Sequence, residues 1–235
     1  MDAPDRGEKY AAIFFDVGGT LLRANPSIGA VYAEVAARYQ IDVQAEAVER
    51  AARRWFHKMR EEELAEGTQH TTSLERARRW WRRLVRLSFG AAADTPRFDD
   101  FFEAVFDEFA RPERYRTFPE VPATLAGLRA AGYRLGIISN WDARLRPILE
   151  GLGLAEAFDP ILISGEVGVE KPDRAIYELA RQRLGARDGA PLLQVGDHPR
   201  DDVAAARAAG FEGRLVNRSA GQTLATTLAD LLPPV

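Results

Sequence analysis

Cysteine is absent from this chain, so disulfide bonds and thiolate chemistry are excluded. The sequence has only three histidines, and a zinc site built from Cys and His is therefore excluded as well. No stretch approaches the roughly 20 consecutive apolar residues that a membrane helix needs. The first ten residues, MDAPDRGEKY, carry acidic side chains and no apolar segment, so we expect no signal peptide and a cytoplasmic protein.

Lysine is also scarce. Among 32 basic residues the only lysines are Lys9, Lys58 and Lys171, so each of them invites a functional question. The formal net charge of -3 predicts no general affinity for nucleic acid or an acidic membrane surface, and we expect a small-molecule substrate instead. The 235 residues fit one domain with a large insertion or two small domains, and no feature indicates an oligomeric state.

Periodicity divides the chain into two kinds of structure. An apolar run at 11–16 reads as a buried strand, and Gly18 and Gly19 break it. Helical spacing then predicts helices at 28–39, 44–66, 73–89 and 98–110. Farther along, helices at 122–131, 142–151, 173–185 and 200–209 alternate with strands at 133–139, 161–164, 191–196 and 213–216.

Repeated strand–helix units imply a parallel sheet with helices on both faces. We therefore predict an α/β protein with a Rossmann-like, doubly wound core formed by 1–25 and 113–235. An inserted all-helical cap domain occupies 26–112 in this prediction. Ligands of such sheets bind beyond the carboxyl ends of the strands, so residues that directly follow the strands are the candidates for a site.

Polar groups follow the predicted strands. The groups that we single out are Asp16 to Thr20, Ser139 and Asn140, Glu170 and Lys171, and Asp197 to Asp202. Carboxylates suit a hard cation such as Mg²⁺, while a hydroxyl, a lysine and free backbone N–H groups suit a phosphate. A carboxylate beside the metal can attack phosphorus, so the combination favours metal-assisted phosphoryl transfer. It requires that Asp16, Lys171 and Asp197 lie within direct contact or one bridging ion of each other.

Four segments, FFDVGGTLL, GIISN, VEKP and VGDHPRDD, resemble in this order the four motifs of the haloacid dehalogenase superfamily. The resemblance covers the predicted core, and the cap falls where this family places its helical cap. It implies a Mg²⁺-dependent hydrolase that forms an aspartyl-phosphate intermediate. The roles that it implies are Asp16 as nucleophile and metal ligand, Gly18 as a metal ligand through its backbone carbonyl, Ser139 and Lys171 as the phosphate-holding pair, Thr20 and Asn140 in support, Asp197 as a metal ligand, and Asp202, or its neighbour Asp201, as the later acid.

Gly18 departs from the family's phosphatases, which usually carry a second Asp there to protonate the leaving group. General acid–base help is worth roughly 10²–10⁴-fold in rate, so esters with poor leaving groups should suffer most. Three interpretations follow: a phosphatase with an activated substrate or with a replacement acid, either His198 or a cap residue; an enzyme that breaks a carbon–halogen or carbon–phosphorus bond; or a non-catalytic binder. Phosphonate cleavage would use a cap lysine, for which Lys58 is available, although an exposed lysine is the simpler interpretation.

The segment ERARRWWRRLVR at 75–86 interleaves basic and aromatic residues, as some nucleic-acid-binding segments do. An amphipathic helix with arginine stems over its rim explains the same pattern. The expected buried face consists of Leu74, Ala77, Trp81, Leu84 and Val85. Trp80, Trp81 and the nearby arginines are alternative candidates for the substrate entrance.

Overall fold

The computed structural model describes residues 9–68 and 71–233. Residues 1–8, 69–70 and 234–235 lie outside the described residues. Most of the N-terminal segment on which the signal-peptide prediction rests is among them. Within the described part, five parallel strands form one sheet in the order β5-β4-β1-β6-β7. The strands are β1 (Ala12–Phe15), β4 (Arg134–Ser139), β5 (Ile161–Ile163), β6 (Leu192–Gly196) and β7 (Glu212–Leu215).

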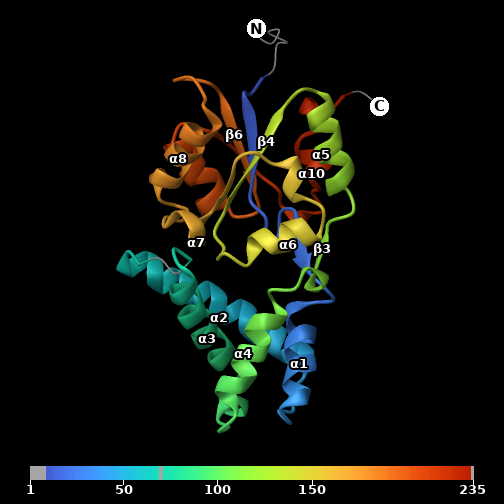
Figure 1. Ribbon diagram of the computed structural model, residues 1–235, viewed down its shortest axis with the longest axis vertical. Helices are drawn as coiled ribbons and strands as arrows, with labels where there is room; N and C mark the ends of the chain where they lie inside the picture. The colour runs from blue at the N-terminus through green and yellow to red at the C-terminus, as the bar shows by residue number, and fades with distance from the viewer. Residues whose placement is uncertain (1–8, 69–70, 234–235) are drawn as a thin grey trace.

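Both faces of this sheet are covered, which explains the apolar runs of its strands. Alternate residues of β1 belong to different clusters: Ile13 and Phe15 pack on one face, and Ala12 and Phe14 on the other. Figure 1 shows α5 and α10 on one side of the sheet and α8 on the other. The helices of the core are α5 (Val121–Ala130), α6 (Leu145–Gly151), α7 (Ser164–Val167), α8 (Arg174–Leu184), α9 (Ala205–Ala208) and α10 (Leu224–Thr227).

Helices also form the insert, which lies between β2 (Leu22–Ala24) and β3 (Tyr115–Thr117). Its helices are α1 (Ile28–Arg38), α2 (Ala45–Glu66), α3 (Leu74–Phe89) and α4 (Phe98–Glu108). Ser27 and Ser73 cap the first turns of α1 and α3 by accepting backbone N–H groups, as sequence rules predict. The insert has an apolar core of its own, rich in aromatic side chains such as Phe101 and Phe102.

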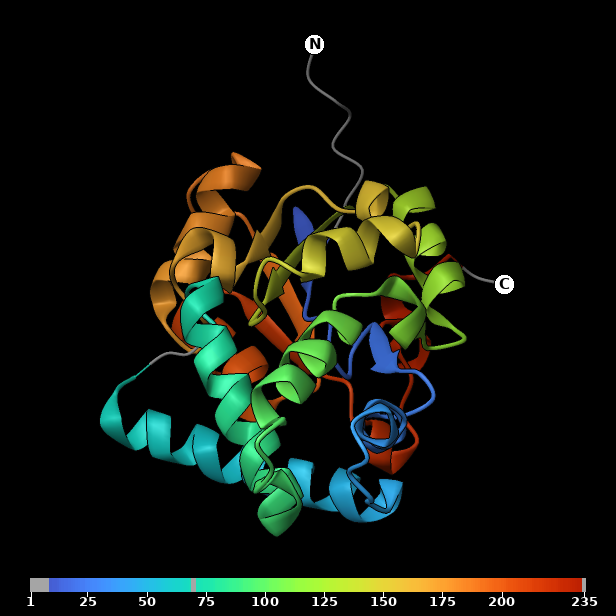
Figure 2. The ribbon, with the colours of Figure 1, turned by 60° about the horizontal axis from the view of Figure 1, so that its bottom comes forward.

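The two strands that flank the insert pair antiparallel and form a ribbon, here called the β2–β3 ribbon. In Figure 1 the insert lies below the sheet, at the end toward which β1 runs. Figure 2, in which that end comes forward, shows α3 and α4 on the viewer's side of the core and α2 along the lower left. The insert is therefore placed beside the candidate site. No helix among the described residues is both long and apolar enough to cross a membrane.

The predicted fold class and the alternation of elements are confirmed, and several details differ. The segment predicted as a helix at 200–209 begins as a π-helical turn, Pro199–Ala204, and only its end is α-helical. Helix α6 starts at Leu145 instead of 142, because the Asp142 carboxylate accepts the N–H of Arg144 and holds a turn there. Short 3₁₀ turns, which periodicity does not reveal, occur at Gly90–Ala93, Pro112–Arg114, Ala155–Ala157, Arg218–Ala220 and Ala229–Leu231.

Helix α3 buries a face slightly different from the predicted one. Trp80 is buried with Met59 and Leu84, whereas Trp81 is only partly buried and Leu74 is 46% exposed. Leu74 is the first residue of the helix, where no neighbouring turn covers it. The helix is amphipathic as expected, with its arginines on the rim.

Candidate active site

Asp16 directly follows β1, and its backbone N–H donates to the carbonyl of Val195 in the neighbouring strand β6 at 2.9 Å. The chain then turns sharply, and the N–H groups of Leu21 and Leu22 both donate to the Val17 carbonyl. Gly19 has φ 78°, a conformation that costs glycine little. A Cβ on Gly19 would also overlap the Asp197 carboxylate, so the turn and the acid at the end of β6 fit together only with glycine there.

Lys171 connects two of the carboxylates. Its Nζ lies 2.8 Å from Asp16 Oδ1 and 2.5 Å from Asp202 Oδ1, and all three side chains are buried. Burial disfavours the charged ammonium, but Asp16 and Asp202 outweigh it and hold the pKa of Lys171 well above its ordinary value. The two carboxylates therefore stabilise the charged form of Lys171 at the end of the sheet.

Polar residues at the ends of β1 and β4 contact the aspartates and the lysine of this site. Ser139 Oγ lies 3.4 Å from Asp16 Oδ1, and Thr20 Oγ1 lies 3.5 Å from Asp197 Oδ1. The Asn140 amide donates to the Lys171 carbonyl and accepts the Lys171 N–H, both at 2.7 Å. Asn140 thus fixes the backbone that carries the lysine.

Carboxylate oxygens of Asp16, Asp197 and Asp202 all lie within 4.8 Å of one another. Asp202 is buried and also accepts the His198 N–H at 3.0 Å, whereas Asp201 turns away toward Arg60 of the insert. The structure therefore brings Asp202, and not Asp201, into this acidic group. The turn Pro199–Ala204 decides between these adjacent residues, and no sequence pattern revealed its π-helical form.

The acidic group suits a divalent cation. Burial, reinforced by Asp202 and Asp197 and opposed by Lys171, raises the pKa of Asp16 to about 7. Burial and the charge of Asp202 raise the pKa of Asp197 to about 6, although this side chain reaches solvent. The Lys171 ammonium, 2.8 Å from Asp16 Oδ1, favours the ionised form of Asp16 and so opposes the effect of burial. When all three carboxylates are ionised, they and the one ammonium carry two net negative charges, which complement a divalent cation that prefers carboxylate oxygens as ligands.

Gly18 lies beside an aromatic ring. Apart from its chain neighbours, the only described atom within 4 Å of a Cβ built on Gly18 is Cζ3 of Trp141, at 3.4 Å. His198 is half exposed, and its Nδ1 accepts the N–H of Asp201 at the start of the π-helical turn. His198 thus serves as a helix cap in this structure.

Sequence reasoning missed two arginines that contact the motif loops. Arg218 donates to the carbonyls of Gly19 at 3.3 Å and Thr20 at 2.5 Å, and so supports the turn after Asp16. Arg60, in α2, contacts Glu170 and Asp201. Neither arginine has a local sequence signal in a chain this rich in arginine.

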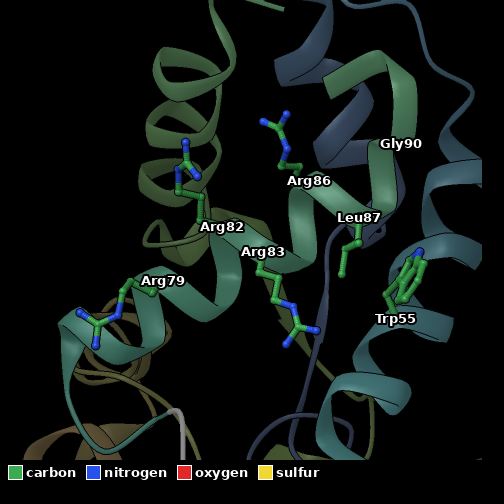
Figure 3. Close-up of a pocket in the computed structure, with 7 residues that line it drawn as sticks. All are labelled: Trp55, Arg79, Arg82, Arg83, Arg86, Leu87 and Gly90. Atoms are coloured by element: carbon green, nitrogen blue, oxygen red, sulfur yellow. The ribbon is translucent and has the colours of Figure 1, made fainter. Parts of the chain in front are cut away.

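Lys58 and the arginines of α3 lie on the surface of the insert, whereas Trp80 is buried within it. Lys58 is exposed, with Nζ 5.0 Å from the centre of the Trp55 ring. Figure 3 shows a groove between α2 and α3, with Arg83 and Leu87 on the side of α3 that faces Trp55. The arginines of this groove are paired with carboxylates on the same or neighbouring elements. These pairs fit the amphipathic interpretation of α3.

The profile of the haloacid dehalogenase-like hydrolases matches residues 10–210. The chain is 32% identical over 212 residues to "Haloacid dehalogenase-like hydrolase domain-containing protein 3" of Danio rerio, covering 89% of this chain and 86% of that one. A phosphoserine phosphatase of Thermus thermophilus is 38% identical over 138 residues, which cover 58% of this chain and 54% of that protein. The crystal structure of a defluorinating L-2-haloacid dehalogenase shares the fold, with a TM-score of 0.71 at 21% identity, over 93% of this chain and 85% of the other. The chain belongs to the haloacid dehalogenase-like hydrolases.

Proposed function

We propose that this hydrolase is a Mg²⁺-dependent phosphatase of a small phosphorylated metabolite, with Asp16 as its nucleophile. The observation that carries the proposal is the contact of Lys171 with both Asp16 and Asp202, while Asp197 completes an acidic group. The similarity to a phosphoserine phosphatase supports phosphoryl transfer from a small phosphorylated molecule. We also propose that 1–25 and 113–235 act as the catalytic core domain and that 26–112 acts as the cap domain over it.

In the proposed first step, a carboxylate oxygen of Asp16 attacks phosphorus, and the bond from phosphorus to the leaving oxygen breaks. Water then attacks the phosphorus of the aspartyl phosphate, which releases inorganic phosphate and restores the Asp16 carboxylate. Ser139 and Lys171 both contact Asp16 Oδ1 and would therefore hold the oxygens of the transferred phosphoryl group. Thr20 orients Asp197, and Asn140 orients Lys171.

Asp16, Asp197, Asp202 and the backbone carbonyl of Gly18 would hold the Mg²⁺ ion. The bound ion supplies positive charge that stabilises the transferring phosphoryl group. Gly18 can act in this way because the role needs only a backbone carbonyl. The chain's own contribution is to keep three carboxylates and one ammonium in fixed contact before substrate arrives.

The leaving group limits the substrate class. Position 18 is a glycine next to the Trp141 ring, so it supplies no side chain to protonate a departing alkoxide. The site therefore favours acyl or aryl phosphates, whose leaving groups depart without a proton.

A dehalogenase is the second candidate, because it needs no leaving-group acid and because solved dehalogenases share the fold. The acidic group counts against it, since a metal-free displacement by Asp16 has no use for Asp197 and Asp202. Phosphonate cleavage by a Schiff base is not favoured, because Lys58 is exposed and lies over Trp55. A non-catalytic binder would keep the geometry without turnover.

A panel of aryl phosphates, acyl phosphates, alkyl phosphates and 2-haloacids, with Mg²⁺ and with chelator, tests the proposal. We expect Mg²⁺-dependent release of phosphate from the first two classes, and loss of this activity in Asp16→Asn. Asp99→Asn, the same change on the exposed surface of the insert, is the matched control and should keep full activity. Chelator-insensitive halide release would establish the dehalogenase, and no turnover at high enzyme concentration would favour the binder.

A further inference from the structure

Arg60 is a buried cation at the junction between insert and core. It lies in α2, its side chain is 11% exposed, and it faces the loops after β5 and β6. Its Nη1 donates to Glu170 Oε1 at 2.8 Å and to Glu63 Oε2 of its own helix at 2.9 Å, and its Nη2 lies 3.4 Å from Asp201 Oδ2. One guanidinium from the insert therefore binds two separate loops of the core.

Each of these two partners is the sequence neighbour of a residue in the candidate site. Glu170 precedes Lys171, and Asp201 precedes Asp202. The Asp201 carbonyl also accepts the hydroxyl of Tyr177 at 2.6 Å, so this loop is held from both sides. A shift of either acid would move the backbone that places the ion pair between Lys171 and Asp202.

A second contact of the insert extends the same network. The Trp141 N–H donates to Ser164 Oγ at 3.0 Å, Ser164 Oγ–H donates to Thr71 Oγ1 at 2.6 Å, and Thr71 Oγ1–H donates to Glu170 Oε2 at 2.5 Å. The hydrogen bonds run in one direction and end on a carboxylate, so each donor and acceptor is used consistently. Glu170, which is 1% exposed, is thus where the contacts from Arg60 and Thr71 meet.

We propose that Arg60 is a positioning residue of the insert, which fixes the Lys171 and Asp202 loops through Glu170 and Asp201. The inference rests on the proposed function for its effect on catalysis and on the geometry alone for its effect on the loops. A guanidinium is suited to this role because its planar fork binds two carboxylates at once, which a lysine ammonium does with poorer geometry. The contacts that hold the insert against the core then also fix the loops that carry Lys171 and Asp202.

The experiment compares Arg60→Gln and Arg60→Lys with Arg53→Gln as the matched control. Arg53 lies in the same helix, is exposed, and pairs only with Glu49 one turn away among its described contacts. Amide hydrogen exchange over 164–172 and 198–204 reports on the loops, and kcat and KM for an aryl phosphate report on the site. Thermal unfolding shows whether each variant is folded, and Arg60→Lys serves in its place if the Gln variant is not.

We expect Arg60→Gln to accelerate exchange in both loops and to lower kcat about 10–100-fold, since small misplacements of catalytic groups have effects of this order. KM should change much less, and Arg60→Lys should recover part of kcat. Arg53→Gln should resemble the wild type in every measurement. A fall in thermal stability with wild-type exchange in the two loops, or faster exchange with unchanged kcat, would overturn the proposal. If the wild type hydrolyses no phosphate, the proposed function fails, and the exchange comparison still decides whether Arg60 fixes the loops.

Discussion

Replacing Gly18 by Asp tests the most consequential departure of this chain from its family. The φ of Gly18 lies outside the positive range that disfavours other residues, and a new Cβ would meet only the Trp141 ring, at 3.4 Å. The turn should therefore accept Asp with little strain. A carboxyl group there would be a proton donor to the leaving oxygen, which is worth roughly 10²–10⁴-fold in rate, or about 3–5 kcal/mol of activation free energy.

The gain should depend on the leaving group. In the wild type we expect kcat/KM to fall steeply as the leaving group of a phosphate ester becomes more basic. In Gly18→Asp, alkyl phosphates should gain about 10²–10⁴-fold, while aryl phosphates should change about tenfold at most, because their leaving groups need no proton. The assay is a series of phosphate esters of graded leaving-group basicity, measured with saturating Mg²⁺.

Gly18→Asn is the control, since it has the size of Asp and cannot act as a carboxylic acid. It should show none of the gain on alkyl phosphates. Equal effects of Asp and Asn would refute the reasoning, because the benefit would then come from shape. A flat dependence on leaving group in the wild type would also refute it, because another group would have to supply the proton.

Two further predictions concern the metal site. Gly19→Ala places a Cβ against the Asp197 carboxylate in a left-handed turn, so it should lower the free energy of unfolding by about 1–2 kcal/mol and weaken Mg²⁺ binding about 10–100-fold. The control Gly18→Ala should change both quantities much less. Denaturant unfolding measures the stability, and calorimetric titration measures Mg²⁺ binding. Because the pKa values of Asp16 and Asp197 are raised, the folded protein without metal binds protons at these carboxyl groups more tightly than the unfolded chain does. The two protonated carboxyl groups therefore contribute most to stability below about pH 4, and this contribution is lost as the pH rises through about 6 to 7. Mg²⁺ needs both carboxylates ionised, so its stabilising effect should grow over the same range, and melting curves with Mg²⁺ and with chelator at several pH values that run parallel would contradict this.

The core of the fold was predictable because its signals are local. Buried parallel strands read as short apolar runs, and Asp16, Ser139, Lys171 and Asp197 follow such runs or lie in loops between them, so topology alone brings them to one edge of the sheet. The β2–β3 ribbon was missed because each strand has three residues and is partly polar, which is too short for an alternating pattern.

The unpredicted parts of the site depend on contacts between distant segments. Arg60 and Glu170 are 110 residues apart, and nothing near either of them in the sequence indicates the pair. Asp201 and Asp202 are adjacent acids with the same local signal, and only the π-helical turn directs one into the site. Trp80 and Trp81 differ in the same way, since one residue of helical rotation decides which ring is buried.

The β2–β3 ribbon makes the two ends of the insert neighbours in space. The backbone N–H of Asn25 donates to the carbonyl of Arg114 at 2.8 Å, so the chain leaves the core and returns to it at almost the same point. A segment attached in this way can be replaced as a unit, because the ends of any replacement need only span the distance between two paired strands. Lengthening or recasting the helices would leave the register of the sheet and the Asp16 turn untouched, which gives evolution, or a protein engineer, a means to change what reaches the site without rebuilding it.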